Sequence, residues 1–248
     1  MTITERANDL LDRSYAKNIY TYSDFLTSAE QAEVLSAAGD SAVEFFGGCD
    51  FAERKKARFG RKEDISSASD YSLTILKISP RGVKFADDIS HRDVLGATLN
   101  LGVERGKIGD IFACGSEAYI IVDEKIKPLI LSELKKVGRN PVEITEADEI
   151  PESFRPKRQK KRVSVAALRA DAIVGGAFGL SREESSSLFK KSRVSVNGKD
   201  LPDGSKKLKT GDAVSVRGYG KFAFTGEDGQ SRKGKTFVVL EIFKEKTR

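Results

Sequence analysis

The 248-residue sequence predicts an α+β protein with a helical N-terminal part, a central sheet backed by helices, and a basic C-terminal domain. Three observations support this prediction. The length suits two or three compact domains. Apolar residues recur at helical spacing near the N-terminus, whereas later segments mix short β-branched runs with helical ones. Charge is segregated, because residues 149–248 hold 23 Lys and Arg against 12 Asp and Glu, while the whole chain holds 43 against 37.

Residues 1–70 are predicted to form a mostly helical domain. Apolar side chains at helical spacing indicate helices over residues 3–20 and 27–38. Thr27 is followed three positions later by Glu, the pattern of a capping box that satisfies two backbone donors at a helix start. The cations of residues 52–59 are interpreted as a solvated face, with contact to RNA as the alternative. This acidic domain could also host a protein partner.

Residues 71–149 are predicted to form a split αβ plait, a four-stranded sheet backed by two helices. The strands are expected over residues 71–78, 108–113, 118–122 and 141–145, and the helices over residues 92–101 and 126–137. Many plaits bind single-stranded RNA by stacking bases on aromatic side chains of the sheet. Tyr119 is the first candidate for such stacking, followed by Phe112 and Tyr71, and a packing role for each is the alternative.

Residues 150–162 are predicted to form a basic linker. Pro151 and Pro156 disfavour a helix, and six cations among residues 155–162 repel one another. Two interpretations stay open, an inert tether and a phosphate-binding strap that becomes ordered on binding. For the strap, the candidate RNA contacts are Arg158, Lys160, Lys161 and Arg162.

The last domain, residues 163–248, begins with two predicted helices. Ser181 and Glu184 form a second capping-box pattern at the start of the second helix. Asn197-Gly198 is a strong hairpin signal. The helices are expected over residues 166–174 and 181–191, and the strands over residues 194–196, 213–217, 222–225 and 236–243.

Two short helices followed by small strands, with cations where the helices meet the first turn, indicate a domain that docks on RNA. Arg and Lys bind phosphate through charge, and the planar Arg fork can also stack on bases. A capped helix start adds backbone amides that favour phosphate. The candidate contacts are Arg169, Ser181, Arg182, Lys190, Lys191, Arg193 and Lys199.

Residues 163–224 resemble the S-four RNA-binding domain, named after a small-subunit ribosomal protein. The pattern of that domain appears as Arg169-Ala170-Asp171, Ser181-Arg182, Lys190-Lys191, Val194-Ser195-Val196-Asn197-Gly198-Lys199 and Gly211-Asp212. The resemblance adds Asp171 and Asn197 to the candidate RNA-binding residues.

The middle of the chain and its end resemble the YlmH family of bacterial S-four proteins. The resemblance rests on the segments that run from His91 to Ala97, from Leu101 to Ile111 and from Arg217 to Phe222, and it spans roughly residues 10–225. It implies a cytoplasmic protein with this order of domains. It also implies binding to ribosomal RNA and tRNA on large ribosomal subunits that hold obstructed peptidyl-tRNA, in ribosome-associated quality control. Arg217, Lys221, His91 and Arg92 join the candidate contacts.

Enzymatic alternatives find little support in the sequence. His91-Arg92-Asp93 imitates a kinase catalytic loop, but Thr98 stands where the Asn of that loop is expected. Cys49 and Cys114 lack partners at metal-ligand spacing. We therefore expect no catalysis, no metal and no cofactor.

The sequence also bears on location and on a second function class. No apolar run is long enough to span a bilayer, and the N-terminus lacks a signal-peptide pattern, so a cytoplasmic protein without membrane insertion is expected. The alternative function is an interaction factor in cell division or envelope growth, with incidental RNA binding.

Overall fold

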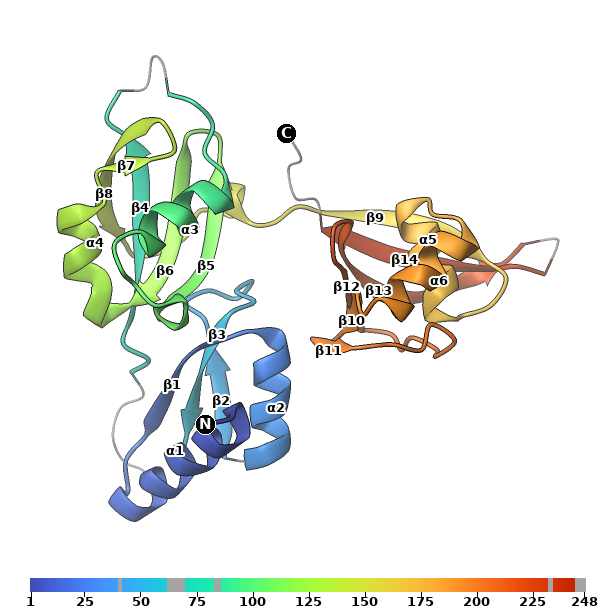
Figure 1. Ribbon diagram of the computed structural model, residues 1–248, viewed down its shortest axis with the longest axis horizontal. Coiled ribbons are helices and arrows are strands. Elements are labelled where there is room, and N and C mark those ends of the chain that lie inside the picture. Colours follow the sequence, from blue (N-terminus) through green and yellow to red (C-terminus); the bar gives the residue numbers. More distant parts are fainter. Residues whose placement is uncertain (40–41, 62–69, 83–85, 232–233, 244–248) are drawn as a thin grey trace. The chain divides into compact units, whose positions relative to one another are not determined.

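The computed structural model describes residues 1–39, 42–61, 70–82, 86–231 and 234–243 (Figure 1). The chain divides into two compact units, Met1–Arg155 and Pro156–Arg248, and each is described by itself. Both units combine helices with antiparallel sheets, which confirms the predicted α+β class. Among the described residues, no helix is both long and apolar enough to cross a membrane.

The N-terminal part of the first unit contains the two predicted helices and a small sheet that the sequence analysis did not predict. Its elements are α1 (Ile3–Lys17), β1 (Thr21–Leu26), α2 (Ser28–Ala38), β2 (Val43–Phe46) and β3 (Lys55–Phe59). Thr27 caps α2 as predicted, since its side chain accepts a hydrogen bond from the Glu30 amide while the Glu30 carboxylate accepts one from the Thr27 amide. The strands form an antiparallel sheet in the order β1-β3-β2.

The rest of the first unit is the predicted plait. Its main elements are β4 (Leu73–Pro80), α3 (His91–Leu99), β5 (Ile108–Cys114), β6 (Glu117–Asp123), α4 (Lys127–Glu133), β7 (Lys136–Val137) and β8 (Asn140–Ala147). The sheet order β5-β6-β4-β8-β7 places the first and third plait strands at the centre, as this fold requires. The second helix is shorter than predicted, because the chain leaves α4 at Leu134 and forms the β7–β8 hairpin around Gly138, whose φ is 58°.

The N-terminal part and the plait share a core. One face of the plait sheet packs against α3 and α4, with Leu76, Ile120 and Ile130 fully buried. The opposite face packs against Phe25 and Ala52 from the N-terminal part. The segments predicted as separate domains, residues 1–70 and 71–149, therefore form one compact unit in the described structure.

The second unit is a six-stranded antiparallel sheet with two helices on one face. Its elements are β9 (Arg158–Val165), α5 (Ala170–Phe178), α6 (Arg182–Lys190), β10 (Val194–Val196), β11 (Lys199–Asp200), β12 (Ala213–Val216), β13 (Gly220–Gln230) and β14 (Thr236–Phe243). The strand order is β11-β10-β12-β13-β14-β9. Alternate side chains of the sheet, such as Phe222 and Leu240, pack with Ile173 of α5 and Phe189 of α6 in the core.

Two predictions for this region were wrong. The last five residues of the predicted linker are strand, because β9 begins at Arg158 and pairs with β14 along its whole length. Alternation places Lys161 on one face and the other three cations on the opposite face, where Arg158 pairs with Glu241 and Arg162 pairs with Asp228. The first helix was predicted over residues 166–174, but α5 begins at Ala170, after an extended segment in which Arg169 pairs with Lys207.

Candidate nucleic-acid interface

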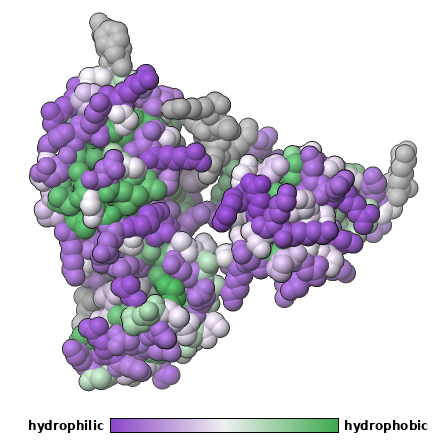
Figure 2. Space-filling model, in the orientation of Figure 1, coloured by the Kyte–Doolittle hydropathy of each residue, from purple (hydrophilic) through white to green (hydrophobic). Residues whose placement is uncertain are grey.

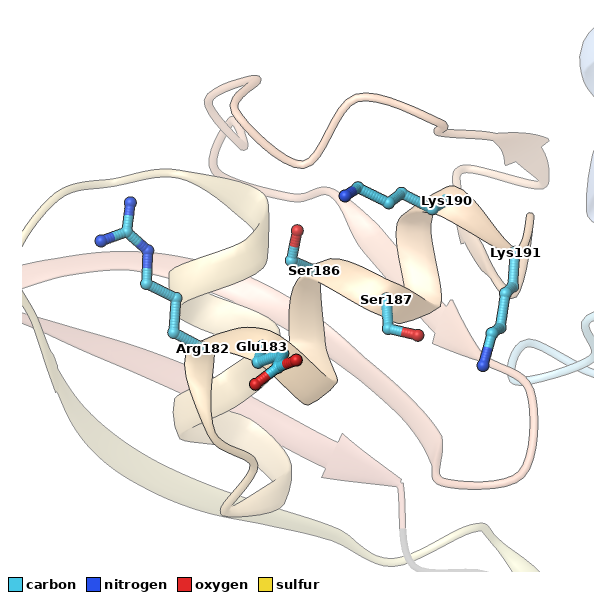
Figure 3. Close-up of a pocket in the computed structure, with 6 residues that line it drawn as sticks. All are labelled: Arg182, Glu183, Ser186, Ser187, Lys190 and Lys191. Carbon is cyan, nitrogen blue, oxygen red and sulfur yellow. The ribbon is translucent and has the colours of Figure 1, made fainter.

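The second helix of the basic unit, α6, has one buried face and one cationic face. Leu188 and Phe189 pack into the core, while Arg182, Lys190 and Lys191 are exposed. Together with Glu183, Ser186 and Ser187, these three cations line an open surface depression (Figure 3). Figure 2 shows a largely hydrophilic surface over the visible face of this unit. The depression is open and lined by three cations, so it suits a large anionic ligand better than a small apolar one.

Cations are better placed at the end of α6 than at its start. Ser181 caps the helix, and Glu184 accepts a hydrogen bond from the Ser181 amide at 2.8 Å. Hydrogen bonds from the side chain and backbone of Ser181 lower the pKa of Glu184, so this carboxylate stays charged beside the helix start. Lys190 and Lys191 instead lie at the end of the helix, where the macrodipole favours positive charge. Ser181 is therefore a structural cap, and phosphate binding is expected at the lysines.

Arg169 is held in place by an acid. Its Nε donates a hydrogen bond to Oδ1 of Asp171 at 3.0 Å, and its Nη2 donates one to Oδ2 at 2.6 Å. The side chain of Arg169 is 39% exposed, whereas that of Asp171 is 9% exposed. The hydrogen bonds to Asp171 and its charge raise the pKa of Arg169. Asp171 therefore orients a cation toward solvent and has little surface of its own for RNA.

Arg193 and Arg217 are brought together where α6 leads into the sheet. The Arg217 amide donates a hydrogen bond to the Arg193 carbonyl at 2.8 Å. A Cβ added to Gly218 would lie 2.8 Å from Nη2 of Arg193, so the guanidinium would have to move to make room for it. The turn before Arg193 is made by Ser192, which adopts a left-handed conformation with φ of 48°.

Asn197 has a structural role in the hairpin. Its Nδ2 donates a hydrogen bond to Oδ1 of Asp212 at 2.9 Å, and its Oδ1 accepts one from the Ala213 amide at 2.9 Å. Asn197 and Gly198 both have positive φ, of 50° and 79°, as the predicted turn requires. Lys199 follows on the short edge strand β11 and is exposed.

The cations of β9 do not lie with those of α6. Lys161 points to the helical side of the sheet, where its Nζ donates a hydrogen bond to the Ala177 carbonyl at 2.6 Å. Arg158, Lys160 and Arg162 occupy the alternate positions and are exposed on the other face. The sequence-predicted contacts therefore divide between two faces of one sheet.

The structure adds exposed residues that the sequence analysis missed. Lys206 and Lys207 lie beside the start of α5, because the Ala170 amide donates a hydrogen bond to the Lys206 carbonyl at 2.8 Å. Tyr219 is 44% exposed in the bend between β12 and β13. The signals for them were an adjacent lysine pair and an aromatic residue flanked by cations, Arg217 and Lys221.

The predicted stacking residues of the plait are covered. Tyr119 is 6% exposed, and its ring centroid lies 4.7 Å from that of Phe154. Phe112 is 7% exposed and packs edge-on against Phe51, with centroids 5.0 Å apart. Base stacking on these two side chains is therefore incompatible with the described structure.

Tyr71 also packs against neighbouring aromatic rings. Its ring contacts those of Tyr22 and Phe46, with centroids 5.3 Å and 5.4 Å away. Burial is the main reason that the pKa of Tyr71 is raised to about 12. His91 and Arg92, by contrast, are exposed in the first turn of α3.

The cationic segment of residues 52–59 is not the solvated face that was predicted. Lys56 and Arg58 are only 2% and 4% exposed. The Lys56 Nζ donates hydrogen bonds to Oδ2 of Asp123 at 2.8 Å and to the Tyr71 carbonyl at 2.9 Å. Arg58 instead pairs with Glu44 of β2 at 2.8 Å, inside the N-terminal part. Lys56 therefore stabilises the junction of the N-terminal part with the plait, and neither buried cation is available to RNA.

Comparisons with known proteins agree with the sequence resemblance. A family model described as "Putative RNA-binding domain in YlmH" matches residues 66–150. A Bacillus subtilis (strain 168) protein named "Ribosome-associated protein quality control protein P2" is 31% identical over 228 residues, which cover 88% of this chain and 86% of that protein. The solved structure titled "Cell division protein ylmH from Streptococcus pneumoniae" covers 58% of this chain and 88% of its own, with 19% identity and a TM-score of 0.47. That structural likeness is too low to support a functional argument.

Proposed function

The chain belongs to the YlmH family of bacterial S-four proteins, and we propose that it binds ribosomal RNA and tRNA on the large ribosomal subunit during quality control of stalled translation. The observation that carries this proposal is the group of cations at the end of α6. Lys190 and Lys191 are exposed there. The half-buried Arg193 follows them in the chain, and a backbone hydrogen bond joins it to the exposed Arg217. Phosphate contacts of this kind supply most of the affinity of nucleic-acid binding.

The exposed side chains of this cluster are available for binding, because the fold does not depend on them for its stability. Exposed cations typically contribute about 0–1 kcal/mol to stability. The backbone around them is held by the Ser181 cap and by hydrogen bonds from the Arg193 and Arg217 amides. Cations on a rigid support lose less conformational freedom on binding.

The ribosomal target is drawn from the family relationship. The name of the Bacillus subtilis relative places that protein in ribosome-associated quality control. We extend the same role to this chain, with a large subunit that still holds peptidyl-tRNA as the target and the cytoplasm as the location. In this role the protein acts by binding and performs no catalytic step.

Co-sedimentation of the full chain with purified large ribosomal subunits tests the proposal. Binding should be tighter to subunits that hold peptidyl-tRNA than to empty ones, and log affinity should fall linearly with log salt concentration. Lys190→Gln combined with Lys191→Gln should weaken binding by about tenfold and make the salt dependence less steep.

The matched control is Arg13→Gln combined with Lys17→Gln, which removes two exposed cations from α1. This control should bind like the unaltered chain. Binding that ignores salt, or equal loss in the α1 and α6 variants, would contradict the proposed interface. Equal binding to empty and obstructed subunits would contradict the role in stalled translation.

A further inference from the structure

The sheet of the second unit has a face that α5 and α6 do not cover. On β9, Val163 and Val165 are buried against the helices, so the alternate side chains point the opposite way. The strand register extends this face onto β14 and β13. We call it the open face and define it by Arg158, Lys160, Arg162, Lys221, Phe237, Val239, Glu241 and Phe243.

Arginine side chains of the open face lie on aromatic rings. The Cζ atom of Arg162 is 3.8 Å from the centroid of the Phe237 ring, and that of Arg158 is 4.8 Å from the centroid of Phe243. The Nζ atom of Lys221 is 5.2 Å from the same Phe243 ring. Neither Phe237 nor Phe243 belongs to the core cluster between the sheet and the helices, and both stay partly accessible.

The described residues of the open face include more cations than acids. Arg158 pairs with Glu241 at 3.2 Å, and Arg162 pairs with Asp228 at 2.6 Å. Lys160 and Lys221 belong to the same surface, so the described residues place four cations beside these two acids. The carboxylates hold the two guanidinium groups against the rings, while the lysines add positive charge beside them.

We infer that the open face is a second RNA-binding surface, which takes single-stranded RNA by stacking bases on the two Arg–Phe pairs and binding phosphates through Lys160 and Lys221. This inference rests on the proposed RNA-binding function and adds a site on the opposite side of the sheet from α6. Single-stranded RNA is recognised by stacking on aromatic rings and on guanidinium planes, beside cations that follow the backbone. Arg158 and Arg162 are about 13 Å apart along the strand, so each pair would receive a different base.

An acidic peptide is the competing ligand for a cationic sheet face. Such a peptide would use the positive charge but would gain nothing specific from flat arginine–phenylalanine pairs. The presence of two such pairs on adjacent strands therefore favours nucleic acid.

Fluorescence anisotropy with the full chain separates the two RNA surfaces. The probes are an unpaired labelled RNA of about 12 nucleotides and a stable RNA hairpin. Arg162→Lys keeps the charge but removes the planar guanidinium, and it should weaken binding of the unpaired RNA by about fivefold or more. Binding of the hairpin should change less than about twofold, because the proposed hairpin contacts lie on α6. Arg13→Lys on α1 is the matched control and should change neither.

A second variant tests the phosphate contact independently. Lys160→Gln should reduce the slope of log affinity against log salt for unpaired RNA by about 0.7, the value for one single-stranded phosphate. Lys17→Gln removes one exposed cation from α1 and should leave the slope unchanged. Thermal melts of both variants check that the fold is retained.

Crosslinking locates the RNA directly. Unpaired RNA that contains 4-thiouridine should crosslink to peptides of β9 or β14 upon irradiation. Crosslinks confined to α6, or unaltered binding of unpaired RNA by both open-face variants, would overturn the inference. The inference would also be overturned if an acidic peptide bound through Arg162 and unpaired RNA did not bind. The full chain could instead fail to bind the hairpin and the ribosomal subunits while it still binds unpaired RNA. That result would contradict the proposed function and would still support the open face as a site for single-stranded RNA.

Discussion

The carboxylate of Asp171 accepts two hydrogen bonds from the Arg169 guanidinium, one from Nε at 3.0 Å and one from Nη2 at 2.6 Å. The same residue joins three segments, because its amide donates to the Gly204 carbonyl and its carbonyl accepts a hydrogen bond from the Ser185 hydroxyl. Asp171 thus orients the Arg169 side chain at a cation-rich surface and links α5 to α6 through hydrogen bonds.

This pairing predicts that removal of a negative charge weakens RNA binding. In Asp171→Asn the Arg169 side chain loses its bidentate partner, and we expect RNA affinity to fall by about three- to tenfold, the effect of one charge-assisted hydrogen-bonding group. The variant should unfold only about 1 kcal/mol more easily. Hairpin binding and thermal melts measure the two effects. Asp200→Asn, on the exposed strand β11, should bind RNA as well as or better than the unaltered chain. Tighter binding by Asp171→Asn would mean that only net charge matters.

The contact of Arg193 with Gly218 leads to a prediction about the backbone. Gly218 has a φ of 89°, and a Cβ there would displace the guanidinium of Arg193. We expect Gly218→Ala to cost about 1 kcal/mol of stability because of its backbone conformation, and also to weaken hairpin binding. Gly211→Ala is the matched control, since Gly211 has a φ of 94° but no atom within 4 Å of the added Cβ. Gly211→Ala should lose a similar amount of stability and keep its affinity for the RNA hairpin. Equal losses of hairpin affinity in both variants would exclude a role for Arg193.

The burial of Tyr119 predicts that this residue does not stack on RNA. Tyr119→Leu keeps an apolar side chain but removes the ring, so RNA affinity should stay within about twofold. A base stacked on Tyr119 would make the same change cost about 1–3 kcal/mol of binding free energy. The first unit should lose roughly 1–3 kcal/mol of stability, because the aromatic contact with Phe154 is lost. Anisotropy with unpaired RNA and a thermal melt distinguish these outcomes.

Local features of the fold could be predicted because their signals lie within a few residues of one another. Ser181 and Glu184 form their capping box with donors and acceptors three positions apart. Asn197-Gly198 makes its turn because both residues tolerate positive φ. Alternation and helical spacing likewise predicted the four main strands of the plait and its first helix, because these patterns lie within each segment.

The mispredicted features depend on contacts between distant segments. Tyr119 is covered by Phe154, which lies in a turn after the last plait strand, and nothing near Tyr119 in the sequence indicates that cover. The strand β9 is basic enough to resemble a linker, and its partner β14 lies at the other end of the unit. The division of the cations between the α6 face and the open face follows from that pairing, so it could not be read from composition.

The buried pair of Lys56 and Asp123 concerns stability alone. Lys56 comes from β3 and Asp123 from β6, with side chains 3% and 8% exposed. Burial by itself would raise the pKa of Asp123. Hydrogen bonds from Lys56 and from the Lys125 amide outweigh that effect, so the pKa lies below its ordinary value. A carboxyl with a lowered pKa stabilises the fold above its unfolded pKa, about 3.9, and loses this contribution as the pH falls through the folded pKa.

Asp123→Asn should therefore destabilise the first unit most at neutral pH, by about 3 kcal/mol, because it leaves the Lys56 charge buried without its counter-ion. The difference from the unaltered chain should shrink as the pH falls below about 3.9, where protonation removes the same charge from Asp123. Urea unfolding followed by tyrosine fluorescence suits this test, since every tyrosine except Tyr219 lies in the first unit. Asp148→Asn removes an exposed acid from the same unit and should change the unfolding free energy by less than about 0.5 kcal/mol at any pH. A difference for Asp123→Asn that stayed constant from pH 7 to strongly acidic solution would show that the pair is held by packing rather than by charge.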